Sequence, residues 1–205
     1  MTNLELVFPE IFISLSIMFL LILGVFKKNS SKLIQNISSI VLLVTAVITF
    51  NETLATEVKF LFNGSVVIDF MSSFMKIVTL LAAFLVLIIS SNYLKILQIF
   101  KIEYPILILC SVLGMMVMIS SNDLIVFYMG LELQSLALYV LATFNRDQLK
   151  SSEAGLKYFV LSALSSGLLL YGCSLIYGFT GSTNFSLIAN QLNSSEYALT
   201  FGIVF

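Results

Sequence analysis

The sequence predicts an all-α protein: a polytopic transmembrane helix bundle with six full spans, the start of a seventh, and a small β-hairpin in an outer loop. Of its 205 residues, 59% are hydrophobic and only 10% are charged, which is too apolar a composition for one core beneath a polar surface. Basic residues also gather in alternate loops. Runs of about 20 apolar residues, long enough to cross a bilayer as a helix, follow one another at residues 7–26, 33–50, 70–90, 104–121, 123–144 and 154–178.

The first of these runs is expected to remain in the protein as a helix. Glu5 and Glu10 stand where a cleaved signal sequence would carry basic residues, and no small-residue cleavage site follows. At the other end, a seventh run begins near Tyr197 and is still apolar at Phe205. This ending leads us to expect that the chain is the front part of a longer protein.

The distribution of basic residues predicts an orientation. Loops on the cytoplasmic or matrix side of a membrane carry an excess of lysine and arginine. Three alternate loops hold most of them: Lys27, Lys28 and Lys32; Lys95 and Lys101; Arg146 and Lys150. The intervening loops contain one basic residue, Lys59, among several acids. We therefore expect the N-terminus to face outward, and the alternation agrees with the number of spans.

The outer loop between the second and third spans contains the sequence VKFLFNGSVVID, residues 58–69. Two strand-like runs flank Asn63-Gly64, and this dipeptide is a strong signal for a tight hairpin turn. We expect a small β-hairpin here, with an irregular loop as the alternative.

Composition also argues against several kinds of site. The chain has no histidine, and both cysteines, Cys110 and Cys173, fall inside predicted spans, where a thiol behaves as a small apolar residue. No glycine-rich phosphate loop is present. No metal site, no cofactor site and no nucleic-acid partner are expected in this chain.

The most informative residue is Glu132, near the middle of the apolar stretch 123–144. Its side chain is too short to reach water from there, and inserting an ionised acid at mid-bilayer costs about 2.5–3.5 kcal/mol on translocon scales. Glu132 is therefore expected to be neutral or paired. One alternative is a protonated acid that only holds a neighbouring helix; the other is a group that gains and loses a proton during transport.

Three further ionisable residues lie in or beside the spans. Lys76 is about two turns from the outer end of its helix, where it could either extend to the lipid headgroups or act in function. Glu153 and Lys157 are spaced i,i+4 in the favourable order for an intrahelical pair. We expect Glu153 near the inner boundary, in a Ser-Ser-Glu run that resembles a helix cap, and Lys157 as a cation that could respond to Glu132.

Residues 130–185, GLELQSLALYVLATFNRDQLKSSEAGLKYFVLSALSSGLLLYGCSLIYGFTGSTNF, resemble the antiporter-like membrane subunit N of respiratory complex I, which is subunit 2 of NADH dehydrogenase in mitochondria. The first four spans resemble this family chiefly in their spacing, their basic inner loops and the sequence DFMSSFMK at residues 69–76. Related cation-antiporter and membrane-hydrogenase subunits share the helix that bears the glutamate. They remain alternatives.

The resemblance implies a longer bundle with two inverted repeats, the first formed by helices four to eight. On this basis residues 1–103 are an N-terminal three-helix part. Residues 104–205 are the front of the first repeat, with helices four to six and the start of seven. The resemblance assigns Glu132 to a proton half-channel and places Glu153 and Lys157 at matching positions on the sixth helix. The lysines that complete such a half-channel lie on later helices, beyond Phe205.

The predicted function is that of a proton-translocating membrane-arm subunit of NADH:quinone oxidoreductase, a translocase in which this chain performs no redox chemistry. NAD, FMN, iron-sulfur clusters and quinone are expected in partner subunits. The expected partners are other complex I membrane subunits, the remaining helices of the same subunit and the lipid of a bacterial or mitochondrial inner membrane. A cation/proton antiporter subunit, or a structural helix bundle in which Glu132 is only hydrogen-bonded, are the alternatives.

Overall fold

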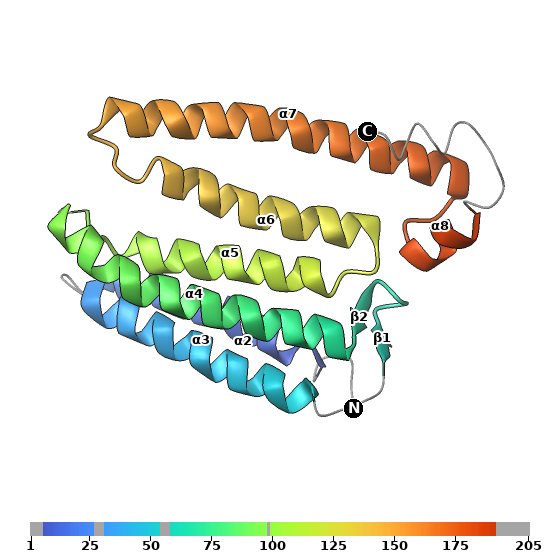
Figure 1. Ribbon diagram of the computed structural model, residues 1–205, viewed down its shortest axis with the longest axis horizontal. Helices are drawn as coiled ribbons and strands as arrows, with labels where there is room; N and C mark the ends of the chain where they lie inside the picture. The colour runs from blue at the N-terminus through green and yellow to red at the C-terminus, as the bar shows by residue number, and fades with distance from the viewer. Residues whose placement is uncertain (1–5, 27–30, 54–57, 98, 192–205) are drawn as a thin grey trace.

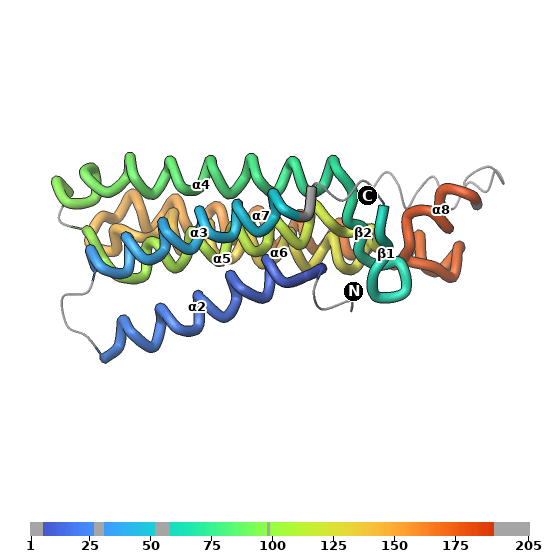
Figure 2. The backbone as a smooth tube through the Cα atoms, turned by 90° about the horizontal axis from the view of Figure 1, so that it is seen from below, coloured from blue at the N-terminus to red at the C-terminus, as the bar shows by residue number. Residues whose placement is uncertain are grey.

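The computed structural model describes residues 6–26, 31–53, 58–97 and 99–191 as an elongated bundle of apolar helices (Figure 1). Successive helices run in opposite directions, and α2 lies obliquely to the others (Figure 2). The long helices are α2 (Phe8–Phe26), α3 (Ser31–Thr53), α4 (Phe70–Ile96), α5 (Glu103–Ile119), α6 (Leu124–Ala142) and α7 (Leu149–Thr180), and a short helix α8 (Phe185–Gln191) follows.

The observed helices agree with the predicted runs, although the structure does not confirm the full number of spans. In the described part of the chain, five helices are long and apolar enough to cross a membrane: α2, α3, α4, α6 and α7. The fourth predicted span, residues 104–121, corresponds to α5, which has only 17 residues. The seventh, near Tyr197, lies outside the described residues. The chain is a multi-pass membrane protein, and the number six remains a prediction.

The predicted β-hairpin is confirmed. Strands β1 (Lys59–Leu61) and β2 (Val66–Ile68) pair antiparallel, with Phe60 opposite Val67. Its turn is longer than two residues: Phe62, Asn63 and Gly64 have φ values of 49°, 57° and 87°. This left-handed region is accessible to glycine and tolerated by asparagine, which explains why the Asn-Gly dipeptide signals the turn.

Helices α2 to α5 share one hydrophobic core. Its fully buried residues come from all four helices and include Ile13, Leu42, Leu80, Leu109 and Met116. Helix α5 is the first helix of the predicted second unit, so the two predicted units pack directly against each other. In contrast, α7 packs mainly beside α6 and leaves most of its apolar surface exposed, as expected for a helix that faces lipid or further helices.

At one end of the bundle, three segments distant in sequence are joined by hydrogen bonds. We call residues 64–67, 120–123 and 181–185 the hairpin-end junction. Val67 N donates to Ser120 O (2.8 Å), Asn122 N to Ser65 O (2.8 Å) and Leu124 N to Thr183 O (2.9 Å). Asn122 and Asn184 both donate a side-chain hydrogen bond to Gly64 O. The junction therefore ties the hairpin to the start of α6 and the end of α7.

The loops rich in basic residues lie at the opposite end. The α4–α5 connection, with Lys95 and Lys101, and the α6–α7 connection, with Arg146 and Lys150, share the left end of Figure 1, away from the hairpin. Lys27 and Lys28 are outside the described residues. This arrangement is the one that the alternation of charges predicts.

Candidate functional site

Glu132 is the ninth of the 19 residues of α6, at the middle of an apolar helix. Its side chain is half-buried, and the oxygen Oε1 is fully buried without a hydrogen-bond partner among the described residues. Buried polar atoms normally have such a partner. The carboxyl group of Glu132 therefore has hydrogen-bonding capacity that a proton, a water molecule or a further donor would satisfy.

The close contact between glycines of α5 and α6 indicates on which side of α6 the Glu132 side chain lies. The backbones of α5 and α6 approach closely at Gly114 and Gly130: a Cβ added to Gly130 would lie 2.8 Å from Met118 N, and one added to Gly114 would lie 2.7 Å from Gly130 O. Glu132 follows Gly130 by two residues, about 200° around the helix. Its side chain is consequently directed away from α5.

The same face of α6 meets α7. Tyr139 follows Glu132 by two turns, and its ring packs edge-on against Tyr158 and Phe159 of α7, with centroids 4.9 Å and 5.7 Å apart. Because α6 and α7 are antiparallel, this contact sets their register and brings Glu132 level with Ser165 and Ser166 of α7. Glu132 thus lies on the side of α6 that faces a run of serines.

A hydroxyl-lined groove of about 340 Å³ lies between α6 and α7 at this level. Five of its lining residues carry hydroxyl groups that could hydrogen-bond water or pass on a proton. Glu132 itself does not line the groove, but Ser135 does, three residues further along α6. The lining residues are Leu131, Ser135, Tyr139, Ser162, Ser165, Ser166, Leu168 and Leu169.

Glu153 and Lys157 form the intrahelical pair that their spacing predicts. Lys157 Nζ lies 2.5 Å from Glu153 Oε1, and the two side chains are 66% and 53% exposed, respectively. Among the described residues, no hydrogen bond or ion pair joins Lys157 to Glu132. The register of α6 and α7 places Lys157 about 12 Å from the level of Glu132 along the bundle, so the two charges are separated by the serine-lined groove.

The position of Glu153 in its helix corrects the predicted cap. Helix α7 begins at Leu149, with Gln148 as its N-cap residue and no side-chain cap hydrogen bond. Glu153 is therefore one turn inside the helix, and the Ser-Ser-Glu run is helical. Ser151 Oγ instead donates to Ala142 O, at the end of α6. The local spacing alone could not reveal this contact across the loop.

Lys76 does not extend to the surface, so the alternative in which its side chain reaches the lipid headgroups is wrong. Its side chain is 1% exposed, and its Nζ donates to Glu10 Oε1 at 2.5 Å, joining α4 to α2. The second oxygen of Glu10 is buried without a partner among the described residues. In the sequence, Glu10 served only as evidence against a signal peptide, and its pairing with Lys76 was not predicted. The available signal was that each residue is a charge within an apolar run, so that the acid of one helix could be expected to pair with the lysine of another.

No group of three or more His, Cys, Asp or Glu side chains that could hold a metal ion occurs among the described residues. The site itself offers carboxyl, ammonium and hydroxyl groups. An apolar helix bundle that carries such groups inside its helices defines a class, the polytopic membrane proteins with intramembrane ionisable residues.

Comparison with known proteins identifies the particular relatives. Residues 121–205 match the family described as "NADH:quinone oxidoreductase/Mrp antiporter, TM". The whole chain is 69% identical to NADH-quinone oxidoreductase subunit N of Pelagibacter ubique, and 99% of it is 50% identical to subunit N of Maricaulis maris. The resemblance to subunit N, predicted from residues 130–185, is confirmed. The chain spans less than half of these relatives, covering 43% and 42% of their lengths.

Solved structures share the fold at low sequence identity. Respiratory complex I from Thermus thermophilus contains a chain with a TM-score of 0.73 and 24% identity, matching 96% of this chain and 43% of that one. A chain of the membrane-bound sulfane sulfur reductase, an archaeal respiratory membrane complex, has a TM-score of 0.83 and 21% identity, and the match covers 98% of this chain and 43% of that one. A chain of the Mrp complex from Dietzia has a TM-score of 0.76 and 22% identity, and the match covers 100% of this chain and 40% of that one.

Proposed function

We propose that this chain forms the front part of a proton-translocating membrane subunit of NADH:quinone oxidoreductase. It acts as part of a translocase and performs no redox chemistry itself; NAD, FMN, iron-sulfur clusters and quinone belong to partner subunits. The identity of 69% to a subunit N over the full chain supports this assignment. Its partners are other membrane subunits of the complex and the remaining helices of its own subunit, in a bacterial inner membrane.

The observation that carries the mechanism is the unsatisfied carboxyl of Glu132 beside the hydroxyl-lined groove. In this proposal Glu132 accepts a proton relayed along water molecules in or next to the groove, each of which receives a proton as it passes one on, and Glu132 later releases the proton to a further water, so that the acid alternates between neutral and charged. Moving one charge across 100 mV requires about 2.3 kcal/mol. That energy comes from electron transfer in partner subunits.

The groove supplies the connection to Glu153 and Lys157. Serines 162, 165 and 166 follow Lys157 along α7 towards the level of Glu132. Hydroxyl groups and waters in this file can transfer a proton between the two levels, and the charge of Lys157 responds to the charge of Glu132 through the groove. Glu153 holds Lys157 at the basic end of the bundle.

The proposed topology has six spans, including α5, with the N-terminus outward. Helices α2 to α4 form the N-terminal part, residues 1–103, and α5 opens the first repeat, residues 104–205. The buried Glu10–Lys76 pair lies in the N-terminal part, away from the groove. We assign Lys76 chiefly to holding α4 against α2 through its ion pair with Glu10. Its contribution to proton transfer is minor.

A second candidate function is a cation/proton antiporter module that works without NADH oxidation. The family description that residues 121–205 match names the Mrp antiporter beside NADH:quinone oxidoreductase, and this supports the second candidate. Co-purification decides between them: a respiratory subunit remains bound to iron-sulfur and flavin subunits through gentle solubilisation, whereas an antiporter module does not.

The test of the mechanism is Glu132→Gln in the complete complex. Glutamine keeps the size and hydrogen-bonding ability of the side chain but removes its change of charge. We expect normal assembly on native gels and a reduced number of protons pumped per NADH oxidised in reconstituted vesicles. Normal pumping by the assembled variant would show that Glu132 is only structural. The matched control is Asp147→Asn, another acid-to-amide change, in the exposed turn between α6 and α7, which should leave the pumping ratio unchanged.

A further inference from the structure

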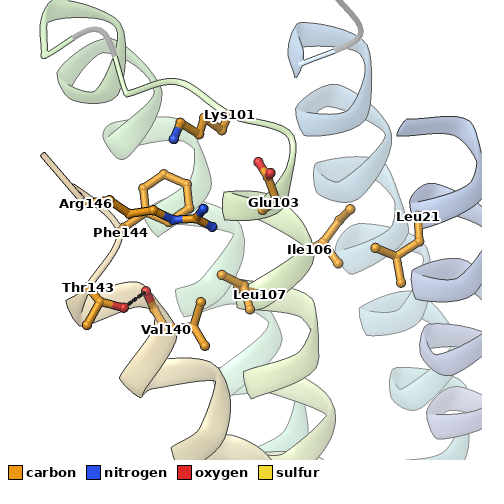
Figure 3. Close-up of a pocket in the computed structure, with 9 residues that line it drawn as sticks. All are labelled: Leu21, Lys101, Glu103, Ile106, Leu107, Val140, Thr143, Phe144 and Arg146. Atoms are coloured by element: carbon orange, nitrogen blue, oxygen red, sulfur yellow. Dashed lines mark hydrogen bonds between the residues drawn. The ribbon is translucent and has the colours of Figure 1, made fainter. Parts of the chain in front are cut away.

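A second groove, of about 260 Å³, opens at the basic end of the bundle between α2, α5 and α6 (Figure 3). Its upper rim carries Lys101, Glu103 and Arg146, and apolar side chains lie below them. It shares no lining residue with the serine-lined groove. The residues that line it are Leu21, Lys101, Glu103, Ile106, Leu107, Val140, Thr143, Phe144 and Arg146.

The charged groups of the rim have no hydrogen-bond or ion-pair partner among the described residues. In the part of the chain that the structure describes, no ion pair or hydrogen bond involves the side chains of Lys101, Glu103 or Arg146. All three residues are exposed. Two cations against one acid leave a single positive charge at the rim, which complements the single negative charge of a phosphodiester.

The walls below the rim suit a hydrocarbon chain. Ile106 and Leu107 lie in the first turns of α5, Val140 lies near the end of α6, and Leu21 of α2 closes the side (Figure 3). Leu21 and Val140 are 46% and 47% exposed. Because α5 and α6 run into the membrane from this end, the apolar surface continues from the charged rim towards the bilayer centre.

We propose that this groove binds one anionic phospholipid. Arg146 and Lys101 hold its phosphate, Glu103 accepts a hydrogen bond from a headgroup hydroxyl, and an acyl chain lies along Leu21, Leu107 and Val140. Basic pockets between transmembrane helices on the cytoplasmic or matrix side of a membrane bind such anionic headgroups. The charged rim above an apolar wall is the reason to favour a lipid over a soluble phosphate, which would use only the rim. This proposal is independent of proton transfer by Glu132.

The test uses the intact complex that contains this subunit, purified in a mild detergent. Retained lipids are counted by native mass spectrometry for the natural protein, Arg146→Gln, Lys101→Gln and the double variant. Each basic residue near a membrane surface contributes an attraction equivalent to about fivefold in affinity. We expect about a thirtyfold weaker affinity for phosphatidylglycerol in the double variant. The matched control is Lys150→Gln, at the same end but outside the groove, which should retain lipid normally.

Two further measurements identify the occupant. The first compares stabilisation of the complex against heat by phosphatidylglycerol, by phosphatidylcholine and by inorganic phosphate. Only the anionic lipid should act through Arg146 and Lys101; equal stabilisation by phosphate would show a soluble anion and overturn the proposal. The second places a photoreactive amino acid at Val140, where a lipid adduct is expected. A protein adduct at Val140, or full lipid retention by the double variant, would also overturn it.

Discussion

Glu10 and Lys76 form an ion pair that is almost fully removed from solvent, yet one oxygen of Glu10 has no partner among the described residues. Burying two charges costs several kcal/mol per ion before their attraction offsets it. Removing one partner leaves the other charge buried and alone. The pair is therefore important for holding α2 against α4, without being a large net source of stability.

We predict that Lys76→Met destabilises the protein by about 3–5 kcal/mol, because it leaves the Glu10 carboxylate buried without its cation. The double variant Glu10→Leu/Lys76→Met should recover most of this loss, since it removes both charges. Thermal unfolding of the purified complex, followed with assembly on native gels, measures both effects. Lys157→Met is the control: its pair with Glu153 is exposed and should contribute only about 0.3–0.5 kcal/mol. A double variant as unstable as Lys76→Met would contradict this account.

The effects of side-chain length and of charge at Glu132 can be measured separately. Glu132→Asp keeps the carboxyl group but withdraws it by one methylene, so part of the pumping should survive. Lys157→Ala should be the next most damaging change after Glu132→Gln, because it removes the cation at the other end of the groove. The variants are ranked by the number of protons pumped per NADH oxidised in reconstituted vesicles. An Asp variant no better than Gln would indicate that position, as well as charge, is essential.

Among the helices, α5 and α6 make the closest contact, through Gly114 and Gly130. A Cβ on Gly114 would lie 2.6 Å from Gln134 N, too close for any side chain without separating the two backbones. The contact controls the rotation of α6 and therefore the direction of Glu132.

Gly114→Ala should accordingly destabilise the bundle by about 1–3 kcal/mol and lower proton pumping more than its effect on assembly explains. Gly167→Ala on α7 is the control, since a Cβ there meets nothing within 4 Å. Thermal unfolding and pumping assays on both variants test this. Equal tolerance of the two substitutions would mean that α5 and α6 can separate freely.

The start of α6 depends on Asp123. Its Oδ1 accepts from Ile125 N at 2.9 Å, capping the helix, and its Oδ2 accepts from Thr183 Oγ1 in the hairpin-end junction. Asp123→Ala should cost about 1 kcal/mol or more through the lost cap and should speed amide hydrogen exchange at both residues 124–127 and 181–185. Asp69→Ala, which removes the cap of α4, is the comparison. Faster exchange confined to α6 would show that the contact with Thr183 does not matter.

For the whole molecule, the structure sets the hairpin and the basic loops at opposite ends (Figure 1). With Cys110 and Cys173 replaced by serine, a cysteine at Phe60, which is 63% exposed, should react with an impermeant thiol reagent added outside intact cells. A cysteine at Lys150 should react only after the membrane is opened. Strong labelling of both positions in intact cells would disprove the proposed number of spans.

Much of the fold follows from local sequence. The helices were predictable because each needs only an apolar run long enough for the bilayer, and the hairpin was predictable because Asn63 and Gly64 accept a left-handed backbone. Glu132, Lys76, Glu153 and Lys157 were selected as candidates from the sequence for a related reason: a charge within or beside an apolar run is costly and therefore conspicuous.

The contacts between these elements required the tertiary structure. Glu10 and Lys76 are 66 positions apart, and Thr183 reaches Asp123 across 60. Such pairs depend on how each helix is rotated and tilted, which no local pattern records. The sequence alone thus determined which segments enter the membrane and which charges they carry. Only packing decided that Lys76 is paired with Glu10 and that Ser135 of α6 and the serines of α7 line one groove close to the level of Glu132, because side-chain partners are chosen by the relative orientation of whole helices.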